Sequence, residues 1–210
     1  MEQLSATGRI SACTIRDRAA HAAFGQPLVT NMLRGLVVEA IVATVLEPDW
    51  RWCSADYAAW DFDRSDGLRL EVKQSAVRQS WAQTKTTARP ATFDIAPRTG
   101  RYDGDVWLAE VRRWADLYVF AHHHVADDTA DHRDPAQWTF YVVLTTALPT
   151  QKTVGLAKVR MLATGCGVDD LKMIVALAAA GGRGPLTPNG ASTPIAGKFD
   201  ASTTPRQLKF

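Results

Sequence analysis

The chain has 210 residues, of which 46% are hydrophobic and 22% are charged, and its formal net charge is +2. This composition is typical of a globular protein with enough chain to bury a sizeable core in one domain. The near balance of 24 basic and 22 acidic residues excludes a protein that coats nucleic acid through overall charge, so any phosphate-binding surface must be a local patch.

Two sequence features bear on where the protein works. The amino-terminal residues 1–5 contain no basic segment followed by an apolar one, and no run reaches the ~18 apolar residues of a membrane helix. The cysteines Cys13, Cys53 and Cys166 are widely spaced and form no Cys-x-x-Cys pair. We therefore expect no disulfide framework, no membrane partner and a cytoplasmic location.

The amino-terminal part of the chain predicts helix followed by short strands. Proline at position 48 ends the long apolar segment, and alternation of side chains indicates strands after it. The expected elements are a short helix or loop at 14–25, a buried helix at 28–46, and strands at 50–53, 58–62 and 68–75, the last two joined by a turn-rich 63–67.

The carboxy-terminal part predicts further strands, one helix and a tail. Half of residues 181–210 are Gly, Pro, Ser or Thr, which is typical of an extended or flexible segment. The expected elements are a strand at 92–96, an irregular 98–114, buried strands at 115–121 and 138–145, and a helix at 169–180. Residues 1–180 would then be a single domain and 181–210 its tail.

Asp61, Glu71 and Lys73 carry the strongest chemical signal. On the strand at 68–75, Leu70 and Val72 are apolar, and the period of two places Glu71 and Lys73 on the opposite face. A hairpin would bring Asp61 beside them from the preceding strand. Two carboxylates and a lysine that converge in this way suit divalent-metal-assisted hydrolysis of a phosphodiester. The alternative is an ordinary solvated strand face, because a bare Glu-x-Lys occurs roughly once in a chain of this length.

Glu39 is the only charge in the apolar segment 36–46. A helix that is hydrophobic all round is buried, and an unpaired buried carboxylate costs several kcal/mol. A metal ion or Lys73 would be a suitable partner, and an arginine or a loop is the alternative. After Lys73, the polar segment 74–81 places Arg78 and Gln79 where they would face the strand end, unless it is a plain connection with surface polar residues.

The order of these elements, a long helix, a short strand, the Asp61 strand, the Glu71-Val72-Lys73 strand and a helix, resembles the PD-(D/E)xK, or restriction-endonuclease-like, nuclease superfamily. The resemblance covers residues 28–81, with looser agreement to about 148. It departs from the family at position 60, where Trp60 stands in place of a proline. It implies an α/β fold with a restriction-endonuclease-like core, in which helices flank a mixed central β-sheet.

The resemblance also implies roles for individual residues. Asp61 and Glu71 would be metal ligands, Glu39 would add a third carboxylate from the helix, and Lys73 would be the catalytic lysine. Gln79 matches a glutamine that some members carry after the lysine. Because carboxylates surround Lys73, we expect it to act by positioning and electrostatic stabilisation.

The expected function is that of an endonuclease that hydrolyses nucleic acid, with DNA the expected substrate and Mg²⁺ or Mn²⁺ as cofactor. One alternative is a non-catalytic nucleic-acid-binding or assembly protein that keeps the nuclease fold. Another is a different α/β enzyme that uses Glu39 and Glu71 on an unrelated substrate. By analogy with the family, the protein would be a homodimer or a subunit of a larger complex.

Two further groups of residues are candidates for binding. The residues expected to contact nucleic acid follow the motif, although scattered solubilising charge explains the basic ones equally well: Arg78, Trp81, Lys85, Arg89, Arg98 and Arg101. His122, His123 and His124 lie near His132 and several aspartates, a combination that can bind zinc or manganese. We expect a hydrated hairpin loop there instead.

Overall fold

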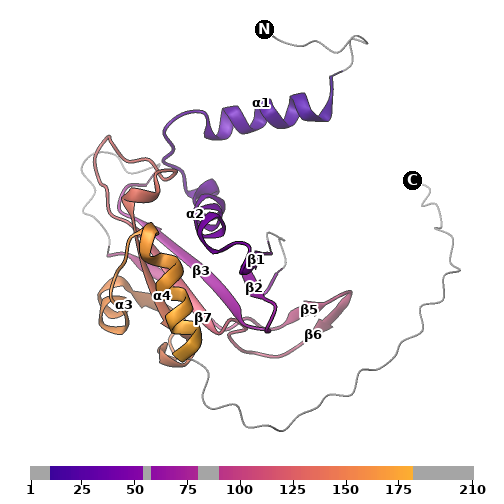
Figure 1. Ribbon diagram of the computed structural model, residues 1–210, viewed down its shortest axis with the longest axis vertical. Helices are drawn as coiled ribbons and strands as arrows, with labels where there is room; N and C mark the ends of the chain where they lie inside the picture. Colours follow the sequence, from indigo (N-terminus) through magenta and orange to yellow (C-terminus); the bar gives the residue numbers. More distant parts are fainter. Residues whose placement is uncertain (1–9, 54–57, 80–89, 182–210) are drawn as a thin grey trace, which may run out of the picture.

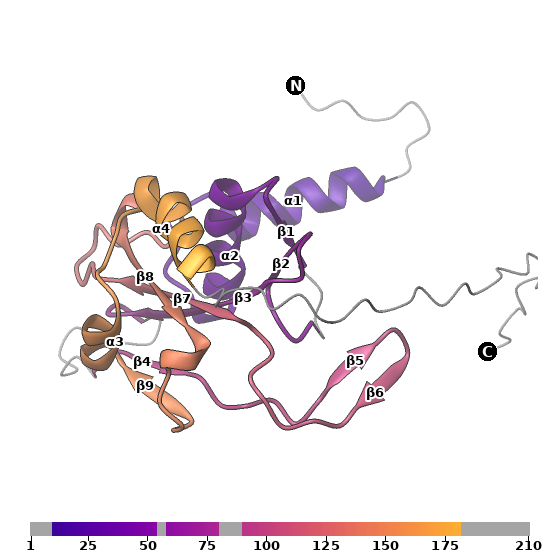
Figure 2. The same ribbon diagram turned by 60° about the horizontal axis from the view of Figure 1, so that its bottom comes forward.

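A computed structural model describes residues 10–53, 58–79 and 90–181. A mixed five-stranded β-sheet runs through the centre, with helices on both faces (Figures 1 and 2), which confirms the predicted α/β class. The strands in sheet order are β1 (Trp50–Trp52), β2 (Phe62–Arg64), β3 (Arg69–Ala76), β7 (Leu117–His123) and β8 (Trp138–Leu144). Only the β3–β7 pair is parallel, and the other neighbours in this sheet are antiparallel.

Helices α2 (Asn31–Leu46) and α4 (Val168–Gly181) cover one face of this sheet (Figure 2). Helix α2 begins where the Thr30 hydroxyl accepts a hydrogen bond from the backbone N–H of Met32. Its inner side packs on apolar strand residues in one continuous core. The expectation that this helix is buried all round is wrong, because the side chain of Met32 is 92% exposed.

The opposite face of the sheet is covered by a smaller layer. Strands β4 (Thr92–Asp94) and β9 (Thr153–Gly155) pair with each other, and α3 (Leu156–Leu162) follows directly. Their apolar side chains pack with β7 and β8 in a second core. The sequence did not predict β9 or α3, which are only 3 and 7 residues long. Helix α3 has no side-chain cap hydrogen bond, so the usual start signal is missing.

Two other segments differ from expectation, whereas a helix is present at the amino-terminal segment where a short helix or loop was expected. Strand β2 begins at Phe62, so Asp61 lies just before it and not inside a strand at 58–62. The segment expected to be irregular contains a hairpin, β5 (Arg101–Asp103) and β6 (Val106–Leu108), whose turn uses Gly104 at φ 59°. Helix α1 (Ala12–Phe24) has no buried residue and lies apart from the sheet (Figure 1). Most of the expected tail, 182–210, lies outside the described residues.

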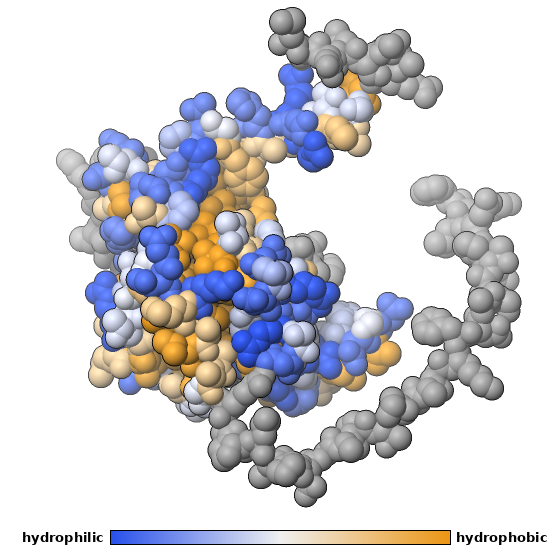
Figure 3. Space-filling view, in the orientation of Figure 1, coloured by the Kyte–Doolittle hydropathy of each residue, from blue (hydrophilic) through white to orange (hydrophobic). Residues whose placement is uncertain are grey.

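Apolar side chains are exposed on the two helices that cover the sheet. Figure 3 shows apolar surface over α2 and along α4. Leu36 on α2 is 46% exposed, and Leu177 on α4 is 63% exposed. In the part of the chain that the structure describes, no helix is long and apolar enough to cross a bilayer.

The central core can be tested at Leu70, which is fully buried between β3 and the helices. Leu70→Ala should reduce the free energy of unfolding by about 2–5 kcal/mol, because it removes buried methyl groups and leaves a cavity. Leu177→Ala, at an exposed position on α4, should change it by less than about 0.5 kcal/mol. Urea unfolding followed by tryptophan fluorescence measures both; equal losses would contradict this description of the core.

Candidate functional site

The site forms where β2 and β3 separate. The backbone N–H of Asp61 still donates to the carbonyl of Leu70, at 3.0 Å. Two residues further along β3, the backbone N–H of Val72 has a side-chain partner. It donates a hydrogen bond to Oδ2 of Asp61, at 2.6 Å. The other edge of β3 stays paired with β7 as far as Ala76. The carboxylate of Asp61 therefore lies at the edge of β3 that β2 has left.

Glu71 and Lys73 project from β3 on the face opposite to Leu70 and Val72, which belong to the core under α2 and α4. Glu71 is only 3% exposed. Its Oε1 lies 2.5 Å from Nζ of Lys73 and 3.2 Å from a guanidinium nitrogen of Arg98. Two cations thus compensate one buried carboxylate, which would otherwise be costly to bury.

A pocket of about 270 Å³ opens beside this ion pair. Polar and aromatic side chains from several elements form its wall together with Glu71 and Lys73, namely Asp94, Arg98, Arg113, Trp114 and Tyr118. Burial and the nearby charge of Glu71 raise the pKa of Tyr118 to about 12, so its hydroxyl is protonated at neutral pH. The pocket offers hydrogen-bond donors and positive charge to an anionic ligand.

The carboxylates act on one another electrostatically. Burial, followed by the negative charge of Glu71, raises the pKa of Asp61 to about 7, although the Val72 N–H opposes this shift. Burial is also the largest cause that raises the pKa of Glu39, with a smaller contribution from Glu71. Lys73 lowers the pKa of both groups. All four charges therefore belong to one region of the protein.

Glu39 reaches this region from α2 and has a partner that the sequence did not indicate. Its Oε2 accepts a hydrogen bond from the indole Nε1 of Trp52 on β1, at 3.0 Å. The side chain is partly buried, so it is not an unpaired charge in the core. Nor do the three expected ligands form a ready cage: within the described residues, no three His, Cys, Asp or Glu side chains are grouped to hold a metal ion.

The residues present nevertheless fit a magnesium ion. Mg²⁺ prefers oxygen ligands, usually takes one or two carboxylates, and keeps several waters. Asp61 and Glu71 supply two carboxylates, and burial, followed by the charge of Glu71, raises the pKa of Asp61. A divalent cation would compensate the charge of Asp61 when that carboxyl ionises. Two protein ligands, with water and substrate completing the set, is the arrangement that these residues support.

The other predicted site residues lie in different surroundings. Gln79 accepts a hydrogen bond from Nη1 of Arg34 at 3.1 Å, and its amide donates to the carbonyl of Ala76. Arg78 forms an ion pair with Asp128, at 2.6 Å. Both side chains are therefore engaged at the end of β3, away from the Glu71 pair. Trp81, Lys85 and Arg89 lie outside the described residues.

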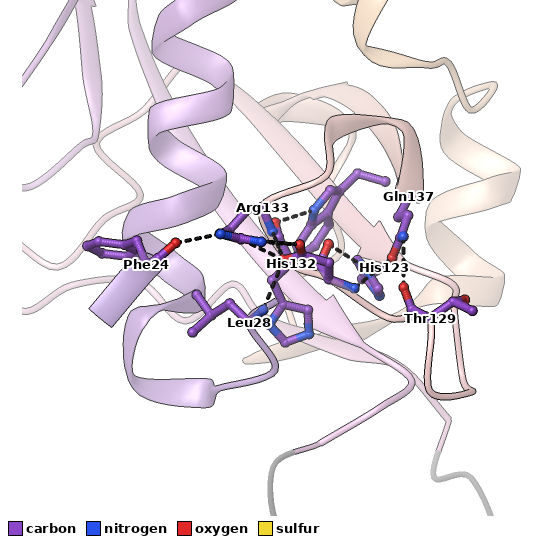
Figure 4. Close-up of polar contacts among 9 residues, drawn as sticks. Phe24, Leu28, His123, Thr129, His132, Arg133 and Gln137 are labelled. Carbon is purple, nitrogen blue, oxygen red and sulfur yellow. Dashed lines mark hydrogen bonds and ion pairs between the residues drawn. The ribbon is translucent and has the colours of Figure 1, made fainter. Parts of the chain in front are cut away.

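The histidine segment is packed inside the protein, so the expectation of a hydrated loop is wrong for its main members. His123 and His132 are both fully buried, and their rings are edge-on at 4.8 Å. Arg133 donates to the carbonyl of Phe24, and the backbone N–H of His132 donates to that of Leu28, at 2.8 Å (Figure 4). The segment thus fastens the linker between α1 and α2 to the sheet.

Other residues around the site have contacts that the sequence did not indicate. Arg98, expected to contact nucleic acid, pairs with Glu71 from 27 positions further along the chain, and no local pattern indicates that contact. Trp60, which departs from the family pattern, stacks under Arg69, with the guanidinium 3.9 Å from the ring centroid. Arg112 lies 4.5 Å from the ring of Trp114 in the same way. These stacks order the strand ends near the site.

Comparison with known proteins gives little. No protein-family model matches the chain, and no curated protein matches it. Among solved structures, similarity is found to a bacterial homing endonuclease, I-Ssp6803I, with a TM-score of 0.36 and 15% sequence identity over 71% of this chain and 96% of that chain. Similarity at this level assigns neither the fold family nor the function, so the site's own chemistry must carry the inference.

The raised pKa of Asp61 predicts a pH dependence of stability in the absence of divalent metal. Between the ordinary value of 3.8 and about 7, the folded protein binds more protons at Asp61 than the unfolded chain does. Asp61 therefore makes stability fall as pH rises through this window. Asp61→Asn removes the effect but keeps an oxygen for the Val72 N–H, so the variant should gain on wild type progressively across the window.

Urea unfolding in a chelating buffer across this pH range measures the difference. Asp63→Asn is the matched control, because hydrogen bonding to Arg51 lowers the pKa of Asp63. Neutralising Asp63 should give no such gain with rising pH. A constant difference between wild type and Asp61→Asn would contradict the electrostatic description of the site.

Proposed function

We propose that the protein is a metal-dependent nuclease of the PD-(D/E)xK type, which hydrolyses phosphodiester bonds in nucleic acid, with DNA the expected substrate. One observation carries the proposal: the Asp61 carboxylate lies at the point where β2 leaves β3, beside the Glu71–Lys73 pair on β3 itself. This juxtaposition brings two carboxylates and a cation together, a set that suits metal-assisted phosphodiester hydrolysis.

Asp61 and Glu71 would hold Mg²⁺ or Mn²⁺. Glu39, whose carboxyl interacts electrostatically with Glu71 and Lys73, would act on the ion through a water. When bound, the ion polarises the scissile phosphate and lowers the pKa of a coordinated water. Lys73 has 27% of its side chain exposed, so its ammonium can approach both the water and the phosphate. Its role would be to orient the attacking water and to stabilise the charge that develops on the phosphate.

Arg98 has two roles in this proposal. It compensates Glu71, and its side chain is 45% exposed, so it can also meet a phosphate from solution. A substrate phosphate would compete with Glu71 for the guanidinium and free part of that carboxylate for the metal. Substrate and metal would therefore bind more tightly together than separately.

A non-catalytic nucleic-acid-binding protein is the second candidate. The observation that favours it is the double compensation of Glu71, whose Oε1 is already bonded by Lys73 and Arg98. If this arrangement persists with nucleic acid bound, the metal has one carboxylate fewer and chemistry is prevented. Cleavage assays distinguish the two candidates directly.

Metal binding should be weak in the absence of nucleic acid, because Mg²⁺ dehydrates reluctantly and usually takes phosphate oxygens as ligands. Asp61→Asn and Glu71→Gln should each reduce the Mn²⁺ affinity further, as measured by isothermal titration calorimetry. Asp116→Asn is the control, since that carboxylate accepts a hydrogen bond from the backbone N–H of Arg69 outside the site. Unchanged affinity in both site variants would place the ion elsewhere.

Lys73→Ala should lower the cleavage rate about a hundredfold or more and leave nucleic-acid affinity nearly unchanged. The reason is that Lys73 would act on the attacking water and the transition state, and contribute little to ground-state binding. The matched control is Lys172→Ala, because Lys172 lies on α4 and pairs with Asp49 at 2.9 Å. Cleavage of single- and double-stranded DNA and RNA with Mg²⁺ or Mn²⁺ is measured beside binding.

Two outcomes would count against this assignment. If wild type binds nucleic acid but cuts none of these substrates with either metal, the binding-protein candidate replaces the nuclease. If Lys73→Ala cuts as fast as wild type, the active site lies elsewhere in the protein.

A further inference from the structure

A second polar cluster lies on the other side of β3, around Arg34. This arginine comes from the first turn of α2 and is only 9% exposed. Its guanidinium donates to the side-chain oxygens of Asn31, Gln74 and Gln79, which come from α2, from β3 and from the segment after β3. The cluster therefore joins the start of the helix to the end of the motif strand.

The cluster has a positive charge that no described acid compensates. All three acceptors are neutral amides, and among the described residues no carboxylate lies within ion-pair distance of Arg34. Buried charges in proteins are normally paired with an opposite charge. The cost is reflected in the pKa of Arg34, which burial lowers. An anion from outside would remove this imbalance.

A donor in the same cluster also lacks a partner. A guanidinium can only donate, so the amide oxygen of Asn31 must face Arg34, at 2.6 Å. The amide nitrogen then points away from Arg34, and it is buried without a hydrogen-bond partner. Unsatisfied buried donors are uncommon in folded proteins, and each is a candidate for a bond to a ligand or water.

The position of the cluster relative to the proposed active site fits one nucleic-acid strand. Asn31, Gly35 and Glu39 recur every four residues and so share one side of α2. A side chain at Gly35 would meet nothing within 4 Å, so the surface between the two ends is open. Eight helical residues span about 12 Å, whereas nucleotides in a strand advance about 3.4 Å each. A strand that lies along this side of α2, with one phosphate near Glu39, would therefore place another near Asn31 a few nucleotides away.

We propose that Asn31 and Arg34 form a phosphate-binding subsite, which takes a backbone phosphate of the nucleic acid a few nucleotides from the bond that is cut. This inference rests on the proposed nuclease function for the source of the phosphate. Gln74 and Gln79 are positioning residues in it, because their oxygens hold the guanidinium. This assigns Gln79 to substrate binding through Arg34, where the family resemblance implies a catalytic role.

Asn31→Asp tests the subsite because stability and binding should change in opposite directions. The aspartate keeps the oxygen that Arg34 uses and adds the missing negative charge, so the melting temperature should rise or stay the same. Affinity for nucleic acid should fall at least about tenfold, and the slope of log affinity against log salt should decrease by about one, as expected for one lost phosphate contact. Binding is measured by fluorescence anisotropy with Ca²⁺ in place of Mg²⁺.

Met32→Asp is the matched control, since it makes the same change of charge one residue along α2 at a side chain that is 92% exposed. It should leave affinity within about twofold of wild type. If Asn31→Asp binds as tightly as wild type or as Met32→Asp, the subsite is wrong, while cleavage by wild type would still uphold the nuclease. If wild type binds no nucleic acid but is stabilised by inorganic phosphate, and Asn31→Asp is not, the subsite holds and the nuclease proposal fails.

Discussion

The backbone N–H of Val72 donates to a side-chain carboxylate where a neighbouring strand would normally accept, and the arrangement of the site follows from this bond. A strand edge inside a protein must satisfy its N–H groups. Asp61 does so while β2 turns away from β3, and among the described residues no strand pairs with the second half of β3 on that side. The same side chain thus ends the β2–β3 pairing and places a negative charge at the open edge.

Compensation of buried charge is the second constraint, and it differs between the two sides of β3. On one side, Glu71 is buried with two cations, so removing Lys73 still leaves Arg98 as a partner. On the other, the side-chain partners of Arg34 among the described residues are neutral amides. Within the described part of the chain, one side therefore pairs its buried carboxylate with cations, whereas the other keeps a positive charge without a paired acid. That charge costs stability, and proteins retain such costs mainly where a ligand offsets them.

Sequence patterns predicted the parts of the fold that depend on local periodicity. The long apolar helix and the alternation of Leu70 and Val72 with Glu71 and Lys73 were recognisable, and so was a buried strand, predicted at 115–121 and observed two residues later as β7. The boundaries of short elements could not be predicted, because three-residue strands such as β2 and β9 are defined by their pairing with other strands. The buried histidines were missed for the same reason: a polar sequence around His132 gives no sign that the linker before α2 will cover it.

In the candidate site too, local patterns were predictable from sequence and tertiary contacts were not. The Glu-x-Lys strand supplied Glu71 and Lys73 together, since two residues on one strand face need no tertiary information. The contacts of Arg98 with Glu71 and of Trp52 with Glu39 could not be predicted, because each joins residues that are distant in sequence.

Arg34 shows the difference most clearly. In the sequence it is an ordinary charged residue at the start of an apolar helix. Its role depends on the residues that surround it in the folded protein. Three amide oxygens from separate elements hold its guanidinium in one orientation, and none of them neutralises it. A preorganised charge of this kind favours binding of an anion, because the entropy cost of ordering the side chain is already included in folding. If both proposals hold, helix α2 contributes twice to substrate binding, with a carboxylate at Glu39 that acts on the metal through a water and a cation at Arg34 that binds a phosphate.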